Sequence, residues 1–300
     1  MLRRLNKNIF YFILFFCFIS LLSIYCAMPY TSSSLGNLFI KQLVWYTIGF
    51  LVMFFVVKVG NKPLFKYSYY FYFSGILLLV LLLLFGIPIN NSKCWFIIPG
   101  IGSVQPSEFM KIFLLLLLSR MCANFRKEDK HSFSDEFLFI FNTFIIVLIP
   151  SILTFLQPDT GSVIIYFITY LMILFFSGIN WKWFLFALLI LGFILGIFGG
   201  IYFFDEELFI SVFGTSFYYR IERIFMWKNG IGLQLENSLS AIGSSGLFGH
   251  GFNKTPIYLP EASTDFIFSI FASNFGFFGV LFFLFYLKLF LYLLILLVSH

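Results

Sequence analysis

Charged residues are scarce in this 300-residue sequence. Asp, Glu, Lys and Arg make up 11% of it, whereas 61% of the residues are hydrophobic, and the mean hydropathy is +0.98. A soluble globular domain of this length is excluded, because it could not bury so much apolar surface. The composition predicts a polytopic membrane protein, and we expect no nucleic-acid partner.

Cysteine and histidine are also sparse. The four cysteines form neither a CxxC pair nor a metal-ligand spacing, so we expect inert thiols and no disulfide framework. His250 stands apart from other candidate ligands, which argues against a zinc site. The Ser/Gly-rich stretch at residues 236–251 lacks the strand-to-helix context and the lysine of a P-loop, so we expect no nucleotide site there.

Long apolar runs dominate the sequence instead. Each is close to the ~20 residues that a helix needs to cross a bilayer, and together they predict an all-α transmembrane bundle of about eight spans: residues 8–28, 38–58, 67–88, 106–125, 137–156, 160–179, 183–204 and 265–298. The fourth run is the least obvious. Its apolar core is short, so Glu108, Lys111 and Arg120 must lie toward the interfaces.

Basic residues predict the orientation. With a cytoplasmic N-terminus, the inner side would hold eleven of the nineteen Lys and Arg residues: Arg3, Arg4, Lys7, Lys58, Lys62, Lys66, Arg120, Arg126, Lys127, Lys130 and Lys182. Cytoplasmic loops normally carry such an excess. We therefore expect a multi-pass protein of the cytoplasmic membrane with its N-terminus inside, and no cleaved signal peptide follows from the first run.

This topology places the polar segments on the outer face. Gln105-Pro106-Ser107-Glu108 and Gln157-Pro158-Asp159-Thr160 each put proline at a predicted first helical position, followed by an acid. Glu108 and Lys111 share one helix face and could pair or point together into a cleft. Helix N-termini next to a lysine would attract an anion such as a phosphate.

Asp265 is the most informative residue, because it lies at the outer mouth of the last apolar run. A carboxylate there is costly to desolvate and usually belongs to a functional polar cavity. The alternative is that Ser263 or Thr264 caps a helix whose dipole Asp265 complements. The position of Asp265 in the sequence does not by itself distinguish these two interpretations. We predict that Trp95, Glu108, Lys111, Asp159 and Asp265 face a common outer cavity.

The predicted outer loop of about residues 205–264 contains two further features. Arg220, Arg223 and Lys228 come first, and a Ser/Gly-rich stretch at residues 236–251 follows. Its glycines indicate sharp turns or close approach of the backbone to a neighbour.

Several motifs together resemble one known family. In order along the chain they are Ser92-Lys93-Cys94-Trp95, Gln105 to Lys111, Gln157-Pro158-Asp159-Thr160-Gly161, Ser238 to Gly249, and Leu259 to Phe268. This succession is similar to the signatures of the SEDS family of RodA, FtsW and SpoVE. The resemblance covers about residues 8–298.

The resemblance implies a peptidoglycan glycosyltransferase that polymerises lipid II, the undecaprenyl-pyrophosphate-linked disaccharide peptide, at the outer face of the membrane for cell shape, division or sporulation. It implies a class B penicillin-binding protein as partner, with other elongasome or divisome proteins. A lipid-linked precursor flippase or transporter is one alternative function. A catalytically inactive scaffold for the penicillin-binding protein is another.

The resemblance also implies roles for individual residues. Asp265 matches the family's essential aspartate, the expected catalytic base, and Trp95 matches its loop tryptophan. The expected substrate-binding residues are Lys93, Gln105, Ser107, Glu108, Lys111, Asp159, Arg220, Arg223, Ser238, Gly243 and Gly246. No metal ligand is assigned, and a divalent cation is compatible with the chemistry.

The sequence departs from the family pattern at a few positions. Cys94 replaces the middle residue of a Lys-Arg-Trp type triplet, and Asn237 replaces the usual glutamine. The family normally has ten spans and a Gly-Val-Pro-Leu-Pro-Phe type motif near the last one, whereas this sequence stops at His300. We therefore expect a single membrane domain over residues 1–300 that lacks the last two family spans.

Overall fold

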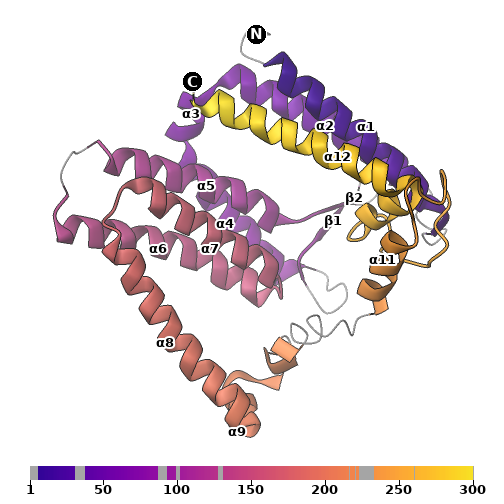
Figure 1. Ribbon diagram of the computed structural model, residues 1–300. Coiled ribbons are helices and arrows are strands. Elements are labelled where there is room, and N and C mark those ends of the chain that lie inside the picture. Colours follow the sequence, from indigo (N-terminus) through magenta and orange to yellow (C-terminus); the bar gives the residue numbers. More distant parts are fainter. Residues whose placement is uncertain are drawn as a thin grey trace. The chain divides into compact units, whose positions relative to one another are not determined.

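The structure is a computed structural model that describes residues 6–30, 38–86, 93–98, 102–127, 131–215, 217–219, 221–222, 233–259 and 261–299 (Figure 1). The chain divides into two compact units. We call Val59–Phe198 the central unit, and we call Met1–Lys58 with Gly199–His300 the terminal unit.

Long helices dominate both units, as predicted. By length and composition, seven of the described helices can cross a membrane: α1 (Lys7–Ala27), α2 (Leu38–Val59), α4 (Ser68–Phe85), α6 (Phe133–Leu156), α7 (Thr160–Ser177), α8 (Lys182–Phe204) and α12 (Ile267–Ser299). The fourth predicted run forms α5 (Pro106–Phe125). Its three charged residues set α5 apart from the seven, so its crossing of the membrane stays a prediction. The protein is a multi-pass helical membrane protein.

The shorter elements are η2 (Met28–Tyr30), α3 (Asn61–Lys66), α9 (Glu206–Phe213) and α11 (Leu233–Gly243), with the strands β1 (Phe96–Ile98) and β2 (Gly102–Val104). The strands form an antiparallel hairpin that pairs Ile97 with Ser103. This hairpin in the loop before α5 was not predicted. It is the one sheet among the described residues.

Two predicted helix starts are shifted, each for a local reason. α6 begins four residues early, at Phe133, because Ser132 and Asp135 form a reciprocal capping box. α7 begins at Thr160, as its apolar run predicts, with Asp159 as its N-cap. The prediction that Pro158 takes the first helical position was wrong. α12 begins at Ile267 rather than at residue 265, because residues 261–266 form turns.

Helices α4, α5, α6 and α7 pack together in the central unit (Figure 1). Leu79 of α4, Leu114 and Leu117 of α5, and Val147 of α6 are fully buried in their shared core. Close packing of α4 on α5 depends on Gly75, where an added Cβ would lie 2.6 Å from Met110 Sδ. Small residues at such contacts let membrane helices approach closely.

Pro150 lies inside α6 and has no N–H to donate to the carbonyl of Ile146, one turn earlier. In a membrane no water replaces that donor, so another group must bind the carbonyl oxygen. Tyr72 of α4 does so, because its hydroxyl donates to Ile146 O at 2.9 Å. The buried tyrosine of α4 thus compensates for the hydrogen bond that the proline of α6 cannot make.

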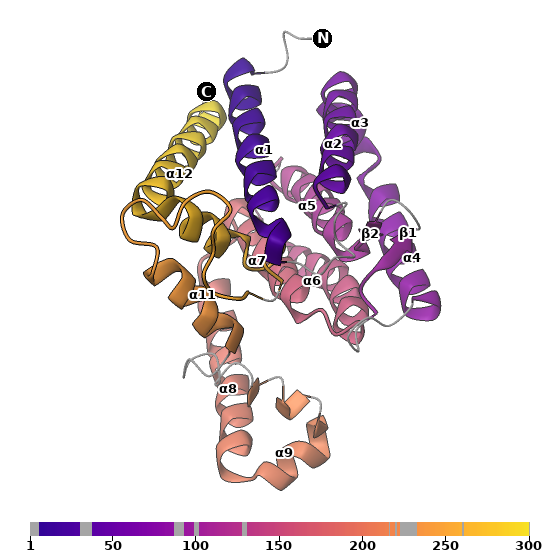
Figure 2. The same ribbon diagram turned by 90° about the vertical axis from the view of Figure 1, so that its right-hand side faces the viewer.

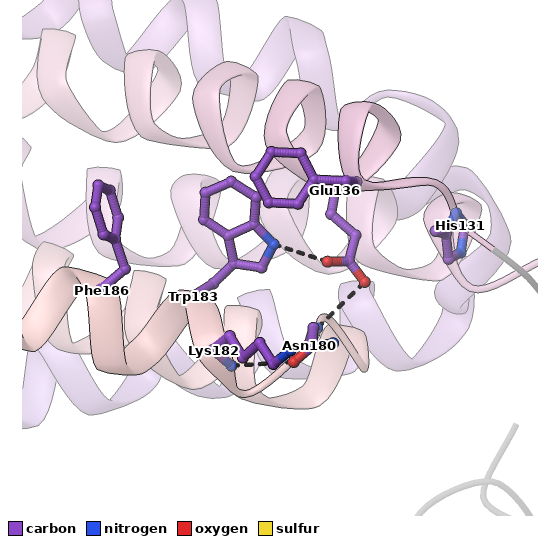
Figure 3. A pocket seen from close by; sticks show the side chains of 7 residues that line it. His131, Glu136, Asn180, Lys182, Trp183 and Phe186 are labelled. Carbon is purple, nitrogen blue, oxygen red and sulfur yellow. Dashed lines mark hydrogen bonds between the residues drawn. The ribbon is translucent and has the colours of Figure 1, made fainter.

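One end of the central unit carries an aromatic pocket of about 520 Å³, at the start of α6 and the α7–α8 turn. Its lining residues are His131, Phe133, Glu136, Asn180, Lys182, Trp183 and Phe186 (Figure 3). The Glu136 carboxylate accepts hydrogen bonds from the Trp183 indole N–H at 2.7 Å and from the Asn180 backbone N–H at 3.2 Å. These bonds hold the beginning of α8 against the beginning of α6.

Helices α1 and α12 run side by side in the terminal unit (Figures 1 and 2), and α2 contacts the beginning of α1. Aromatic rings fill their contacts. Phe15 of α1 lies 3.9 Å from Tyr286 of α12 between ring centroids, and Phe10 of α1 lies 6.0 Å from Phe50 of α2.

The last helix is broken at Gly276, whose φ of 64° and ψ of −164° are not helical. The break leaves backbone groups without their usual helical partners, and the segment after α11 replaces them. Phe277 N donates to Gly246 O at 3.0 Å, and His250 N donates to Ser273 O at 2.8 Å. The predicted close approach of the glycine-rich stretch is therefore confirmed, with α12 as the neighbour.

We expect Tyr72→Phe to lower thermal stability in detergent, by about 1 kcal/mol, because Ile146 O loses its donor. In the Pro150→Ala background the same change should cost less, because the new alanine would supply the missing backbone N–H. Thermal unfolding of the two single variants and the double variant checks this coupling. Equal losses in both backgrounds would contradict it.

A second expected outcome concerns Gly249, which has a φ of +79° and whose added Cβ would collide with the backbone of Asn274. Gly249→Ala should destabilise the terminal unit by at least about 1–3 kcal/mol, the typical cost of a strained backbone. Gly243→Ala is the matched control, because an added Cβ there meets no atom within 4 Å. Similar unfolding temperatures for both variants would argue against the docked arrangement.

Candidate functional site

One group of predicted site residues lies at the end of the central unit where α5 and α7 begin. Gln105 is the N-cap residue of α5, and Pro106 opens that helix as predicted. Asp159 caps α7, and its Oδ1 accepts the backbone N–H of Ser162 at 3.1 Å. The hydrogen bonds of Asp159 bring these two starts together at the same end.

Asp159 connects these two helix starts. Its Oδ2 accepts hydrogen bonds from Gln105 Nε2 at 2.7 Å and from Ser107 Oγ at 2.9 Å. Ser162 Oγ contacts Ser107 Oγ at 3.3 Å, and Tyr166 donates from its hydroxyl to Ser107 O at 3.0 Å. The Asp159 carboxylate is thus held by three donors from two helices.

These bonds give Gln105, Ser107 and Asp159 a structural role, in addition to any role in substrate binding. Ser107 is 1% exposed, so its hydroxyl faces the helix contact rather than an open surface. Ser162 and Tyr166 were not among the predicted site residues. The spacing of Ser162, three residues after an N-cap aspartate, is the signal that could have found it.

Other predicted site residues at this end of the central unit are exposed or partly exposed. Trp95 is 37% exposed, and Lys93 is partly exposed. The loop that carries both is tied to the bundle by Cys94, whose Sγ lies 2.8 Å from Gln157 O. The predicted Glu108–Lys111 pair is confirmed as an ion pair of 2.7 Å, with the side chain of Glu108 56% exposed and that of Lys111 21% exposed.

Asp265 lies in the terminal unit, in the turn before α12, and is exposed. Among the described residues its carboxylate has no hydrogen-bond or ion-pair partner. Thr264 does not cap α12, because its hydroxyl lies 3.3 Å from Glu261 O and 3.1 Å from Glu261 Oε2. The contacts therefore give no support to capping of α12 by Thr264.

The segment around Asp265 is nevertheless well anchored. Leu259 and Ala262 are buried before it, and Ile270 is buried after it. Ser238 Oγ and Ser269 Oγ lie 2.6 Å apart, which joins α11 to α12. An exposed carboxylate on an anchored turn can be presented to a ligand in a defined position.

The Ser/Gly-rich stretch is mainly structural in this arrangement. Ser238 is buried, and Asn237 Nδ2 donates to Tyr258 O at 3.0 Å. Gly246 adopts a φ of +58° where its carbonyl meets α12, and Gly243 is the last residue of α11. Arg220 and Arg223 lie outside the described residues.

No group of three or more His, Cys, Asp or Glu side chains is placed to hold a metal ion within the described ranges. Trp95, Glu108, Lys111 and Asp159 belong to the central unit, whereas Asp265 belongs to the terminal unit. Their common cavity stays a prediction.

Comparisons with known proteins agree with the resemblance. Residues 6–300 match the family model described as "Cell cycle protein", that of FtsW, RodA and SpoVE. The chain is 33% identical over 252 residues to the probable peptidoglycan glycosyltransferase FtsW of Wigglesworthia glossinidia brevipalpis, covering 80% of this chain and 60% of that protein. It is 32% identical over 256 residues to stage V sporulation protein E of Bacillus subtilis, covering 80% of this chain and 63% of that protein.

Solved structures share the fold. One is from work titled "Structural coordination of polymerization and crosslinking by a peptidoglycan synthase complex", with a TM-score of 0.72, 21% identity, and coverage of 95% of this chain and 76% of that chain. The rod shape determining protein RodA of Thermus thermophilus has a TM-score of 0.60 and 23% identity, covering 95% of this chain and 72% of that chain.

These relatives are longer proteins, and the chain spans 60% and 63% of the two curated relatives named above. The family model nevertheless matches nearly every residue of the sequence. The chain belongs to the FtsW, RodA and SpoVE family.

Proposed function

We propose that this protein is a peptidoglycan glycosyltransferase that polymerises lipid II on the outer side of the cytoplasmic membrane, with its N-terminus in the cytoplasm. The names of its curated relatives support the activity. The observation that carries the proposal is Asp265, an exposed carboxylate without a partner among the described residues, on an anchored turn before a membrane helix.

In the proposed reaction Asp265 accepts the proton of the acceptor sugar's 4-hydroxyl group. The oxygen of that group attacks the anomeric carbon of the donor sugar, and the bond from this carbon to the pyrophosphate breaks. The lipid pyrophosphate leaves with the bonding electrons. This single displacement inverts the anomeric carbon, and it needs no covalent intermediate with a carboxylate nucleophile.

The leaving pyrophosphate gains negative charge, so cations near it would lower the barrier. Lys93 and Lys111 are the candidates at the open end of the central unit. Lys111 is already paired with Glu108 at 2.7 Å. We therefore assign the larger electrostatic contribution to Lys93 and treat Glu108 and Lys111 as groups that position the substrate.

A class B penicillin-binding protein is the proposed partner. A related fold belongs to a peptidoglycan synthase complex that coordinates polymerisation with crosslinking. In such a pairing the partner would crosslink the strands that this chain polymerises.

A photoreactive lipid II analogue should label two segments if one cavity holds the substrate: residues 93–98 next to Trp95, and residues 261–268 next to Asp265. Mass spectrometry of the digested protein identifies the labelled peptides, and excess lipid II should suppress both labels equally. Labelling of only one segment would contradict the common cavity.

We expect Asp265→Asn to lower lipid II polymerisation by roughly 10²–10⁴-fold, because asparagine cannot accept the proton. Glu261→Gln is the matched control, since Glu261 is an exposed carboxylate of the same turn. Glycan-strand length is measured with the partner present. The same measurement is made on stage V sporulation protein E in which the matching aspartate is changed to asparagine. Full activity of the folded aspartate variants would reject the catalytic assignment and favour a flippase or scaffold function.

A further inference from the structure

The central unit has a second pocket, of about 410 Å³, at the end remote from Asp159. It lies where α3 meets the last turns of α5 (Figure 1). Four of its lining side chains are cations, and no described lining residue is acidic: Lys62, Phe65, Lys66, Arg120, Ala123, Asn124 and Lys127. Such a concentration of one charge around a hollow favours an anionic ligand.

Arg120 is held in a fixed position in this pocket. Its Nη1 donates to Phe65 O at 3.0 Å and to Lys66 O at 2.9 Å, both at the end of α3. Its guanidinium also lies 5.1 Å from the centre of the Tyr69 ring. These contacts organise the centre of the pocket, because they fix one cation before any ligand binds.

The other cations lie at the exposed rim. Lys62, Lys66 and Lys127 are exposed, and Lys127 Nζ donates to Asn124 Oδ1 at 2.9 Å. Phe65 is 38% exposed and adds an apolar surface beside them. Charged and apolar groups are thus adjacent, as in the headgroup and upper acyl region of a phospholipid.

The position of the pocket along the chain indicates its depth in the membrane. Lys62, Phe65 and Lys66 lie between two membrane spans, Leu38–Val59 and Ser68–Phe85. The pocket therefore lies where helices leave the hydrocarbon, at the level of lipid phosphates. Basic pockets between membrane helices on the cytoplasmic side bind the headgroups of anionic phospholipids.

We propose that this pocket binds the headgroup of an anionic phospholipid, and that a cardiolipin with its two phosphates binds it most tightly. The site is independent of lipid II polymerisation and lies at the opposite end of α5. Solvated lysines that only set membrane orientation would explain the charges. Such lysines would need neither a pocket beside them nor an arginine whose guanidinium is held by backbone carbonyls.

The test uses the purified full chain in detergent, with native mass spectrometry to count retained lipids at increasing concentrations of cardiolipin or phosphatidylcholine. One variant carries Lys62→Gln, Lys66→Gln and Lys127→Gln. Its matched control carries Lys7→Gln, Lys58→Gln and Lys182→Gln, which remove three exposed lysines outside the pocket. Arg120 is left unchanged because it joins α5 to α3.

We expect one cardiolipin to be retained in preference to phosphatidylcholine. The pocket variant should lose roughly 100-fold in cardiolipin affinity, because each lysine beside a lipid phosphate contributes a factor of about five. The control variant should lose less than about threefold, because its lysines lie outside the pocket. Added salt should weaken retention by the unmodified protein, a measurement that needs no variant.

Three results would overturn the proposal. Equal losses in the two variants would assign the effect to overall charge. Equal retention of phosphatidylcholine and cardiolipin would remove the anionic selectivity. Retention of inorganic pyrophosphate as strong as that of cardiolipin would assign the pocket to a soluble phosphate.

Discussion

Every backbone polar group inside a membrane needs a partner from the protein, and this constraint shapes both units. The two interrupted helices meet it in different ways. In α6 the carbonyl left free by Pro150 binds the hydroxyl of Tyr72. In α12 the break at Gly276 is repaired by backbone groups of the segment after α11. The glycine-rich motif therefore belongs to the same structural solution as the break.

The same constraint separates structural from chemical residues at the candidate site. Asp159, Gln105 and Ser107 use their polar atoms on one another, and they hold the starts of α5 and α7 together. Asp265 differs, because no described group satisfies its carboxylate. Family motifs mix both kinds of residue. Their contacts, rather than their place in a motif, indicate which residue is available for proton transfer.

Much of the helical architecture could be predicted from apolar run length, since a bilayer imposes about 20 residues on each span. Helix ends were less predictable, because they depend on local caps such as Ser132 with Asp135. The break at Gly276 was missed, because its partners lie in a segment remote along the chain. The Glu108–Lys111 pair was predictable from helical spacing alone. The contacts of Asp159 with Gln105 and Ser107 were not, since they join residues more than fifty positions apart.

α5 carries residues of both sites proposed for the central unit. Its first turn carries Glu108 and Lys111 at the candidate catalytic end, and its last turns carry Arg120 at the basic pocket. Both ends are charged, while one face between them, with Leu114 and Leu117, is fully buried, and Ile112 and Leu115 on another face are exposed. The buried face holds α5 against α4, α6 and α7. Its two charged ends are therefore held at opposite ends of the central unit, which a freely tilting apolar helix would not achieve.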